Sequence, residues 1–95
     1  MNSTERAKLR SIAMTMQPTL QIGKNGITET VLQEIDEQLS QKELIKITVL
    51  NNAECSAKEW IASIAEQCRA EPVQAVGNKI TLYRVSDRDG VKHIL

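Results

Sequence analysis

The sequence predicts a two-layer α/β domain whose elements follow the order α-β-α-β-α-β-β and whose four strands form a mixed sheet. Segments with the apolar spacing of a helix alternate with short segments in which every second residue is apolar. Near the end, two short apolar segments are separated only by Gly77-Asn78-Lys79, which is typical of a hairpin. Helical connections imply that the first three strands run parallel, and the hairpin makes the fourth antiparallel.

The first predicted helix covers residues 4–16. Its apolar residues recur at intervals of three and four, as expected for one face of a helix: Leu9, Ile12, Ala13 and Met16. Ser3 or Thr4 is the expected cap, and Pro18 prevents the helix from continuing. A short strand at residues 19–22 follows.

The other two helices begin at capping residues. Thr28 is the expected cap of the second helix, whose apolar stripe is Val31, Leu32, Ile35 and Leu39. Ser56 is the expected cap of the third helix, and Glu59 three residues later completes a capping box. The stripe of this helix is Ile61, Ile64, Ala65 and Cys68, and Pro72 is expected to end it.

The later strands are short and rich in β-branched residues. Apolar and polar residues alternate at residues 44–50, and the hairpin joins residues 73–76 to residues 80–85. Residues 86–95 are expected to be a loose tail of a single domain that covers residues 1–95. If the helices cover one face of the sheet, the side chains that point at them are Leu20, Ile22, Ile45, Ile47 and Val49.

Composition places the chain among ordinary globular proteins, with 41% hydrophobic and 25% charged residues. No apolar run reaches the roughly 20 residues of a membrane span, and the N-terminus has no signal-peptide core, so we expect a soluble, cytoplasmic protein. The formal net charge is zero. Residues 1–26 and 72–95 are nevertheless net positive while residues 27–45 are net negative, which permits a basic surface opposite an acidic one.

Catalysis and metal binding are not expected. His93 is the only histidine, no nucleophile has an adjacent base, and no phosphate-binding loop ends in Gly-Lys-Ser/Thr. Cys55 and Cys68 lie near the two ends of one predicted helix, about 20 Å apart, which is too far for a disulfide. Neither cysteine has the spacing of a zinc site. We therefore expect no cofactor.

The loop Gly23-Lys24-Asn25-Gly26 is the most informative motif, because it joins a strand to a capped helix. Glycines let the backbone approach a ligand closely, and the first amides of a helix point outward with partial positive charge. With Lys24 added, the loop suits a phosphate. The same residues are typical of a simple tight turn, so the loop alone leaves both interpretations open.

Five segments in order, including this loop, give the chain a resemblance to a known family: Lys8-Leu9-Arg10-Ser11-Ile12-Ala13, Pro18, Ile22 to Glu29, Glu43-Leu44-Ile45-Lys46-Ile47, and Gln74 to Gly77 with Leu82-Tyr83-Arg84. The chain resembles, over nearly its full length, the CRM domain family, named for chloroplast RNA splicing and ribosome maturation. It is most similar to the bacterial single-domain, YhbY-like members.

This resemblance implies an RNA-binding domain that shares the fold of the C-terminal domain of bacterial initiation factor three. It also implies association with precursors of the large ribosomal subunit. Family members present the glycine loop and neighbouring basic residues to RNA. The chain departs from the family at Met14, where relatives commonly carry a histidine after the Leu-Ala or Ile-Ala pair, which puts any polar role of that position in doubt.

Together the loop and the resemblance predict contacts with the RNA backbone, much as the loop of KH domains makes them. The predicted RNA-binding residues are Gly23, Lys24, Asn25 and Gly26 in the loop, Arg6, Lys8 and Arg10 in the first helix, and Lys46 and Arg84 if they fall on the same side. The only large aromatic residues, Trp60 and Tyr83, are expected to pack rather than to stack on bases.

We expect a monomer whose partner is RNA, either ribosomal RNA or a precursor of the large subunit, with no membrane partner and no small-molecule substrate. A different class of function remains open. The acidic second helix, with Glu29, Glu34, Asp36 and Glu37, is also suited to a basic ribosomal protein or assembly factor.

Overall fold

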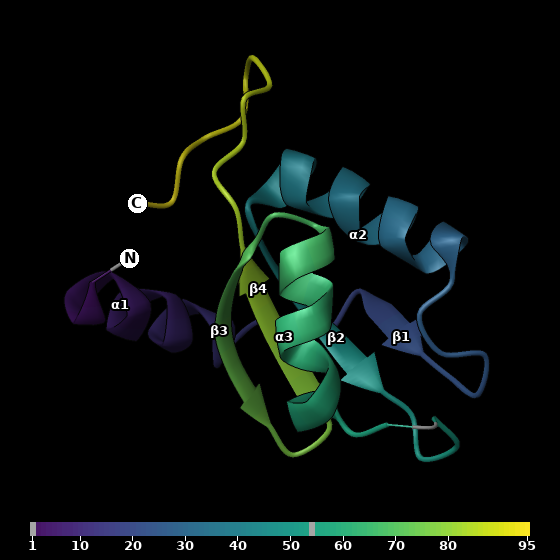
Figure 1. The fold of residues 1–95 in the computed structure, drawn as a ribbon. Coiled ribbons are helices and arrows are strands. Elements are labelled where there is room, and N and C mark those ends of the chain that lie inside the picture. Colours follow the sequence, from purple (N-terminus) through teal and green to yellow (C-terminus); the bar gives the residue numbers. More distant parts are fainter. Residues whose placement is uncertain (1, 54) are drawn as a thin grey trace.

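The computed structural model describes residues 2–53 and 55–95, which form three helices and four strands (Figure 1). The helices are α1 (Ser3–Ala13), α2 (Glu29–Lys42) and α3 (Ala57–Gln67). The strands are β1 (Leu20–Ile22), β2 (Leu44–Val49), β3 (Glu71–Val76) and β4 (Lys79–Tyr83). The predicted order of elements is confirmed. None of the helices in these described residues is long and apolar enough to cross a membrane.

The strands form one mixed sheet in the order β1-β2-β4-β3. Strand β1 pairs parallel with β2, and β4 pairs antiparallel with both β2 and β3, so the predicted strand directions are confirmed. The register places Ile22 beside Val49 and Thr48 beside Lys79. The carboxyl ends of β1 and β2 and the turn between β3 and β4 therefore lie at the same end of the sheet.

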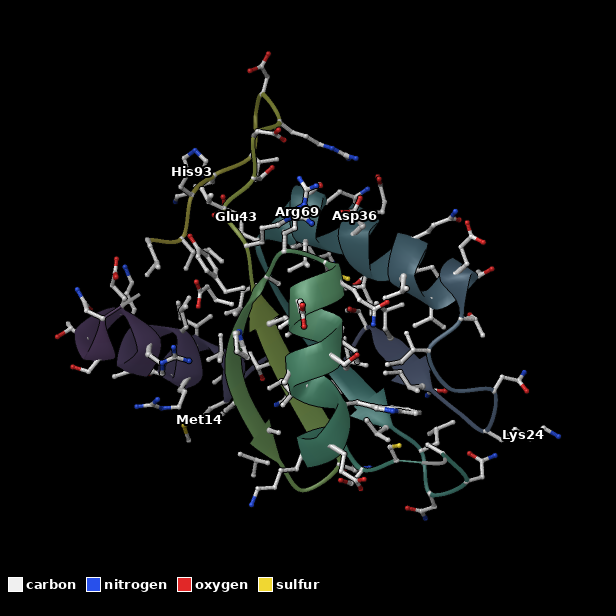
Figure 2. All side chains as sticks on the ribbon, in the orientation of Figure 1. Met14, Lys24, Asp36, Glu43, Arg69 and His93 are labelled. Atoms are coloured by element: carbon white, nitrogen blue, oxygen red, sulfur yellow. The ribbon has the colours of Figure 1, made fainter. Side chains whose placement is uncertain are left out.

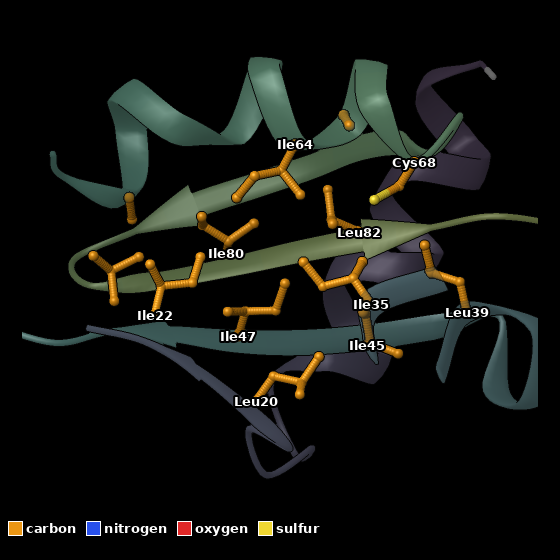
Figure 3. Packing of buried hydrophobic residues seen from close by; sticks show 13 residues of the cluster. Leu20, Ile22, Ile35, Leu39, Ile45, Ile47, Ile64, Cys68, Ile80 and Leu82 are labelled. Atoms are coloured by element: carbon orange, nitrogen blue, oxygen red, sulfur yellow. The ribbon is translucent and has the colours of Figure 1, made fainter. Parts of the chain in front are cut away.

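The main core lies between one face of the sheet and helices α2 and α3 (Figure 3). It contains all five strand residues that were predicted to point at the helices: Leu20, Ile22, Ile45, Ile47 and Val49. From the helices come Ile35, Leu39, Ile64, Ala65 and Cys68. The Cys68 thiol is buried, and burial raises its pKa, which agrees with packing rather than reactivity. Cys55 and Cys68 are both free thiols.

Helix α1 lies on the opposite face of the sheet. Its buried Leu9 packs with Leu44, Val73 and Tyr83, and Ile12, Met16 and Ile94 complete this second cluster. Strand residues two apart share a face, so the side that carries Leu44 also carries Lys46 and Thr48. Because α1 covers only one end of this face, the remainder stays open.

The start of α1 differs from the prediction. Asn2, rather than Ser3 or Thr4, is the cap, and its side chain accepts a hydrogen bond from the Glu5 amide at 2.8 Å. Glu5 accepts in return from the Asn2 amide, so the two residues form a complete capping box. A cap at Ser3 or Thr4 would lack this reciprocal partner, which explains why the helix begins one residue earlier.

Several other boundaries move by a few residues. Helix α1 ends at Ala13, because the Thr15 and Met16 amides bond to carbonyls only three residues back and tighten the last turn. Helix α3 ends at Gln67, and Arg69 adopts a positive φ of 56° just beyond it. The predicted role of Pro72 as the helix stop was therefore wrong, since Pro72 lies within β3.

Glu43 links the end of α2 to the C-terminal tail, residues 86–95. Its side chain is fully buried and accepts hydrogen bonds from the Ser86 amide at 2.6 Å, the Ile94 amide at 3.0 Å and His93 Nδ1 at 2.6 Å. The tail has no helix or strand, but these contacts correct the expectation that it is loose. A buried carboxylate needs hydrogen-bond donors, and the tail supplies them.

Candidate nucleic-acid interface

The glycine loop is a closed four-residue turn. The Gly26 amide donates to the Gly23 carbonyl at 3.0 Å, which places Lys24 and Asn25 at the exposed central positions. Gly26 has a φ of +69°, a conformation that other residues rarely adopt. Figure 2 shows Lys24 at the edge of the molecule, pointing into solvent. The Gly26 amide is therefore engaged in a hydrogen bond within the turn, whereas the Lys24 ammonium and the Asn25 side chain are exposed to solvent.

Helix α2 begins directly after this turn. The Thr28 hydroxyl accepts from the Val31 amide at 3.1 Å, and the first backbone helical bond runs from the Leu32 amide to the Thr28 carbonyl. The Glu29 and Thr30 amides precede that bond, so they have no acceptor within the helix. The Glu29 side chain lines a groove between α2 and α3 together with Gln33 and Gln67. The helix start therefore adds backbone donors beside the loop.

Two neighbouring segments support the loop, and sequence reasoning did not find them. A Cβ atom built on Gly26 would lie 3.5 Å from the Trp60 ring, so the indole packs behind the turn. A Cβ atom on Gly23 would lie 3.8 Å from Asn52 Oδ1, which brings the β2–α3 connection alongside. This juxtaposition follows from the pairing of β1 with β2, and no local sequence signal reports it. Asn52 is exposed and adds a polar side chain to the site.

The basic residues of α1 are not brought to the loop. Figure 1 shows α1 at one edge of the fold and the β1–α2 loop at the other. Arg6 donates to the Pro72 carbonyl of β3, Lys8 is exposed, and Arg10 is partly exposed. The predicted site thus consists of two separate basic regions, one at each edge of the sheet.

Lys46 lies on the α1 side of the sheet, partly buried. Its ammonium group donates to the Ala13 carbonyl at the end of α1, at 3.0 Å. An ammonium group has three N–H donors, so this bond leaves two of them for another acceptor. Lys46 therefore stands nearer to α1 than to the glycine loop.

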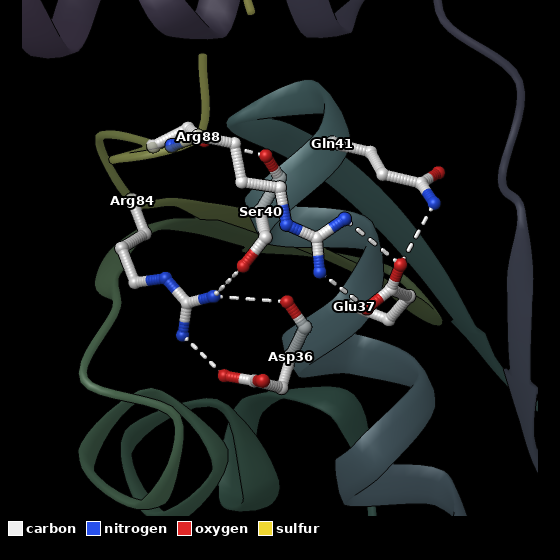
Figure 4. A network of polar contacts seen from close by, with 7 residues as sticks. Asp36, Glu37, Ser40, Gln41, Arg84 and Arg88 are labelled. Carbon is white, nitrogen blue, oxygen red and sulfur yellow. Dashed lines mark hydrogen bonds and ion pairs between the residues drawn. The ribbon is translucent and has the colours of Figure 1, made fainter.

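Arg84 is not available to a ligand in the same way. Its guanidinium donates to Asp36 Oδ1 at 2.7 Å, to the Asp36 carbonyl and to the Ser40 hydroxyl (Figure 4). It also donates to the Cys68 carbonyl. Only 19% of its side chain is exposed. Arg84 follows β4 at the end of the sheet opposite the loop. It ties α2 to the end of α3, and we exclude it from the proposed interface.

Two ion pairs offset part of the negative charge of helix α2. Arg84 pairs with Asp36, and Arg88 pairs with Glu37 at 2.6 Å. The Arg88 hydrogen bond, followed by the Gln41 bond, lowers the pKa of Glu37, which keeps this carboxylate charged and paired. Glu43, which follows α2, is buried, so Glu29 and Glu34 are the exposed acidic residues of α2 that these two ion pairs do not involve. The pairing of Asp36 and Glu37 makes this part of α2 less suited to dock a basic protein.

Neither large aromatic residue forms an open stacking platform. Tyr83 is only 8% exposed and packs beneath α1, where burial and the charges of Glu43 and Glu5 raise its pKa. Trp60 is partly buried against the main core. Among residues 2–53 and 55–95, no group of three His, Cys, Asp or Glu side chains could hold a metal ion.

Comparisons with known proteins place this geometry in a family. The sequence model of the CRS1 / YhbY (CRM) domain matches residues 1–84. The chain is 37% identical to the "Probable RNA-binding protein YqeI" of Bacillus subtilis (strain 168), over 82% of the chain and 81% of that protein. It is 32% identical to an "RNA-binding protein" of Haemophilus influenzae, over 92% of the chain and 88% of the relative.

The fold is also similar to a solved structure. The solution structure of the hypothetical protein SAV1595 from Staphylococcus aureus matches with a TM-score of 0.78 and 38% sequence identity. The match covers 94% of this chain and 93% of that protein.

Proposed function

Because the chain belongs to the CRS1 / YhbY (CRM) domain family, we propose that it binds RNA and, more specifically, ribosomal RNA in precursors of the large ribosomal subunit. Relatives named as RNA-binding proteins support the general function. The ribosomal target rests on what membership of the family implies, and the assignment is that of a binding protein rather than an enzyme.

The observation that carries the proposal is the exposed turn at the start of α2. It combines the Lys24 ammonium, the Asn25 side chain and the unpaired first amides of the helix, all of which suit phosphate oxygens. Asn52 flanks the turn. With no open aromatic platform on the described residues, recognition depends on the RNA backbone and its shape more than on its bases.

Reversing the charge of Lys24 tests the loop. Lys24→Glu is expected to weaken binding of single-stranded ribosomal RNA about tenfold, and to reduce the salt dependence of log affinity by about one unit. The thermal midpoint should stay nearly constant, because Lys24 is exposed. Fluorescence anisotropy over a range of salt concentrations measures both effects.

Lys42→Glu is the matched control. Lys42 is also exposed, but it lies in the last turn of α2, at the other end of the sheet from the loop. It should leave RNA affinity close to that of the wild type. If the Lys24→Glu and Lys42→Glu variants bound RNA with equal affinity, the loop would not be part of the binding site.

The ribosomal target has its own test. In native extracts, the protein is expected to sediment with particles of the large-subunit precursor, and ribonuclease treatment before sedimentation should release it. Persistence after ribonuclease would instead support the interaction with a basic protein partner. In-cell crosslinking followed by sequencing of the attached RNA would then report the position of contact.

A further inference from the structure

A groove of about 350 Å³ lies on the open part of the sheet face that carries α1. It is lined by Met14, Lys46, Gln74, Val76, Lys79 and Thr81. These residues come from the end of α1 and from β2, β3 and β4, so the groove crosses three adjacent strands. Its volume is within the range of small-molecule sites, which begins at about 300 Å³.

The charge of the groove is positive. Its lining includes two lysines and no acidic residue. The Lys46 ammonium is held by the Ala13 carbonyl at 3.0 Å and the Lys79 ammonium by Asn78 Oδ1 at 2.8 Å. Each ammonium group keeps two further N–H donors, so both can bind an anion. An occupant with negative charge fits this electrostatic pattern.

The rest of the lining is apolar with a polar margin. Met14 is 78% exposed and Val76 is 62% exposed, both unusually high for large apolar side chains. The Gln74 amide adds a neutral hydrogen-bonding group, and the buried Thr81 forms part of the floor of the groove. A methionine thioether makes favourable contacts with aromatic rings. This combination matches a flat aromatic ring attached to an anionic group, which describes a nucleotide.

The position of the groove connects the two basic regions that the fold separates. Lys79 pairs with Thr48 next to the end of β2, and β2 is the neighbour of β1, which leads into the glycine loop. Two strand spacings, about 10 Å, separate β1 from β4. On the other side, Met14 follows Arg10 and Arg6 at intervals of four residues, so all three share one face of α1.

We propose that this groove binds one nucleotide of the RNA strand that the glycine loop holds. The base contacts Met14 and Val76, and the phosphate contacts Lys46 and Lys79. The strand then continues toward Arg10 and Arg6. This inference rests on the proposed RNA-binding function and adds a second contact, which gives the separated basic regions one continuous path.

Two charge-introducing variants test the groove. Met14→Glu and Lys79→Glu are each expected to weaken binding of single-stranded ribosomal RNA about fivefold relative to the Lys42→Glu control. Met14 is mostly exposed, so its substitution leaves the fold intact, and thermal midpoints verify this for both variants. In parallel, RNA that contains 4-thiouridine is crosslinked to the wild-type protein. The crosslinked peptides should contain Met14 or residues 74–81.

Each alternative result has a distinct meaning. If both groove variants bind like Lys42→Glu while Lys24→Glu still weakens binding, the groove is not an RNA site and the proposed function stands. If the wild-type protein does not bind RNA, both proposals fall. If RNA affinity is unchanged but the groove variants lose ribonuclease-resistant sedimentation with particles, the groove contacts a protein, and its assignment to RNA is overturned.

Discussion

Replacing Glu43 with alanine is expected to destabilise the protein by about 3 kcal/mol, because the change leaves buried donors without an acceptor. The carboxylate receives bonds from the Ser86 amide, the Ile94 amide and His93, and its side chain has no solvent exposure. Such a loss lowers the thermal midpoint of a domain of this size by about 15 °C. Differential scanning calorimetry measures it, and amide hydrogen exchange should show the C-terminal tail released.

Replacing Glu43 with glycine separates the effect of losing the carboxylate from the effect of the backbone conformation at this position. Glu43 has φ 67° and ψ −38°, a conformation that is strained for any residue with a Cβ atom. Glu43→Gly should therefore be more stable than Glu43→Ala by about 1 kcal/mol, although less stable than the wild type. Equal stability of the two variants would show that the backbone at this position stores no strain.

The pH dependence of stability provides a further check on Glu43. Burial alone would raise the pKa of this carboxyl group, but the bonds from Ser86, His93 and Ile94 outweigh it and lower the pKa below its ordinary 4.5. A carboxyl group whose pKa is lower in the folded state than in the unfolded state stabilises the fold at pH values above its unfolded-state pKa. This stabilisation is lost as the pH falls toward the folded-state pKa. Urea unfolding should show stability decreasing below pH 4.5, and less steeply in Glu43→Gln.

Replacing Arg84 with alanine is expected to cost about 2 kcal/mol of stability, or about 10 °C in thermal midpoint, while the folded variant keeps wild-type RNA affinity. The guanidinium joins α2 to the end of α3 through bonds to Asp36, Cys68 and Ser40. Its removal leaves the Cys68 carbonyl and the Asp36 carboxylate without this donor. Thermal unfolding and RNA anisotropy at low temperature measure the two properties independently.

Arg88→Ala is the matched control for Arg84. Arg88 also pairs with an acid of α2, but its side chain and that of Glu37 are 45% and 52% exposed. Exposed ion pairs contribute little to stability because water and salt screen them. Its loss should barely change the midpoint. A fall in RNA affinity for Arg84→Ala without loss of stability would show that Arg84 is part of the RNA interface.

Local signals were sufficient to predict the elements. Thr28 and Ser56 cap helices as expected, because a cap and its partner lie within three residues of each other. The alternation at residues 44–50 predicted a strand with one apolar face, and Ile45 and Ile47 are buried in the core. Asn2 was missed although its capping box with Glu5 is equally local. The adjacent Ser3 and Thr4 offered competing caps.

Long-range contacts were not predictable in this way. Arg84 meets Asp36 across 48 residues of sequence, and Glu43 meets Ser86 across 43. No spacing rule connects such positions, so a basic residue near the end of the chain was assigned to RNA when it binds an internal acid. The open groove at Met14 could not be predicted for the same reason, since it depends on α1 packing on the face of the sheet opposite α2 and α3.

The bond between Glu43 and the C-terminal tail also bears on the synthesis of the protein. Ribosomes produce a chain from its N-terminus at about 5 to 20 residues per second, so β2 emerges seconds before its partners in the tail. Until Ser86 and Ile94 have left the ribosome, the carboxylate of Glu43 keeps its water and lacks these two backbone donors. The domain therefore completes its fold only after the chain has been translated through Ile94.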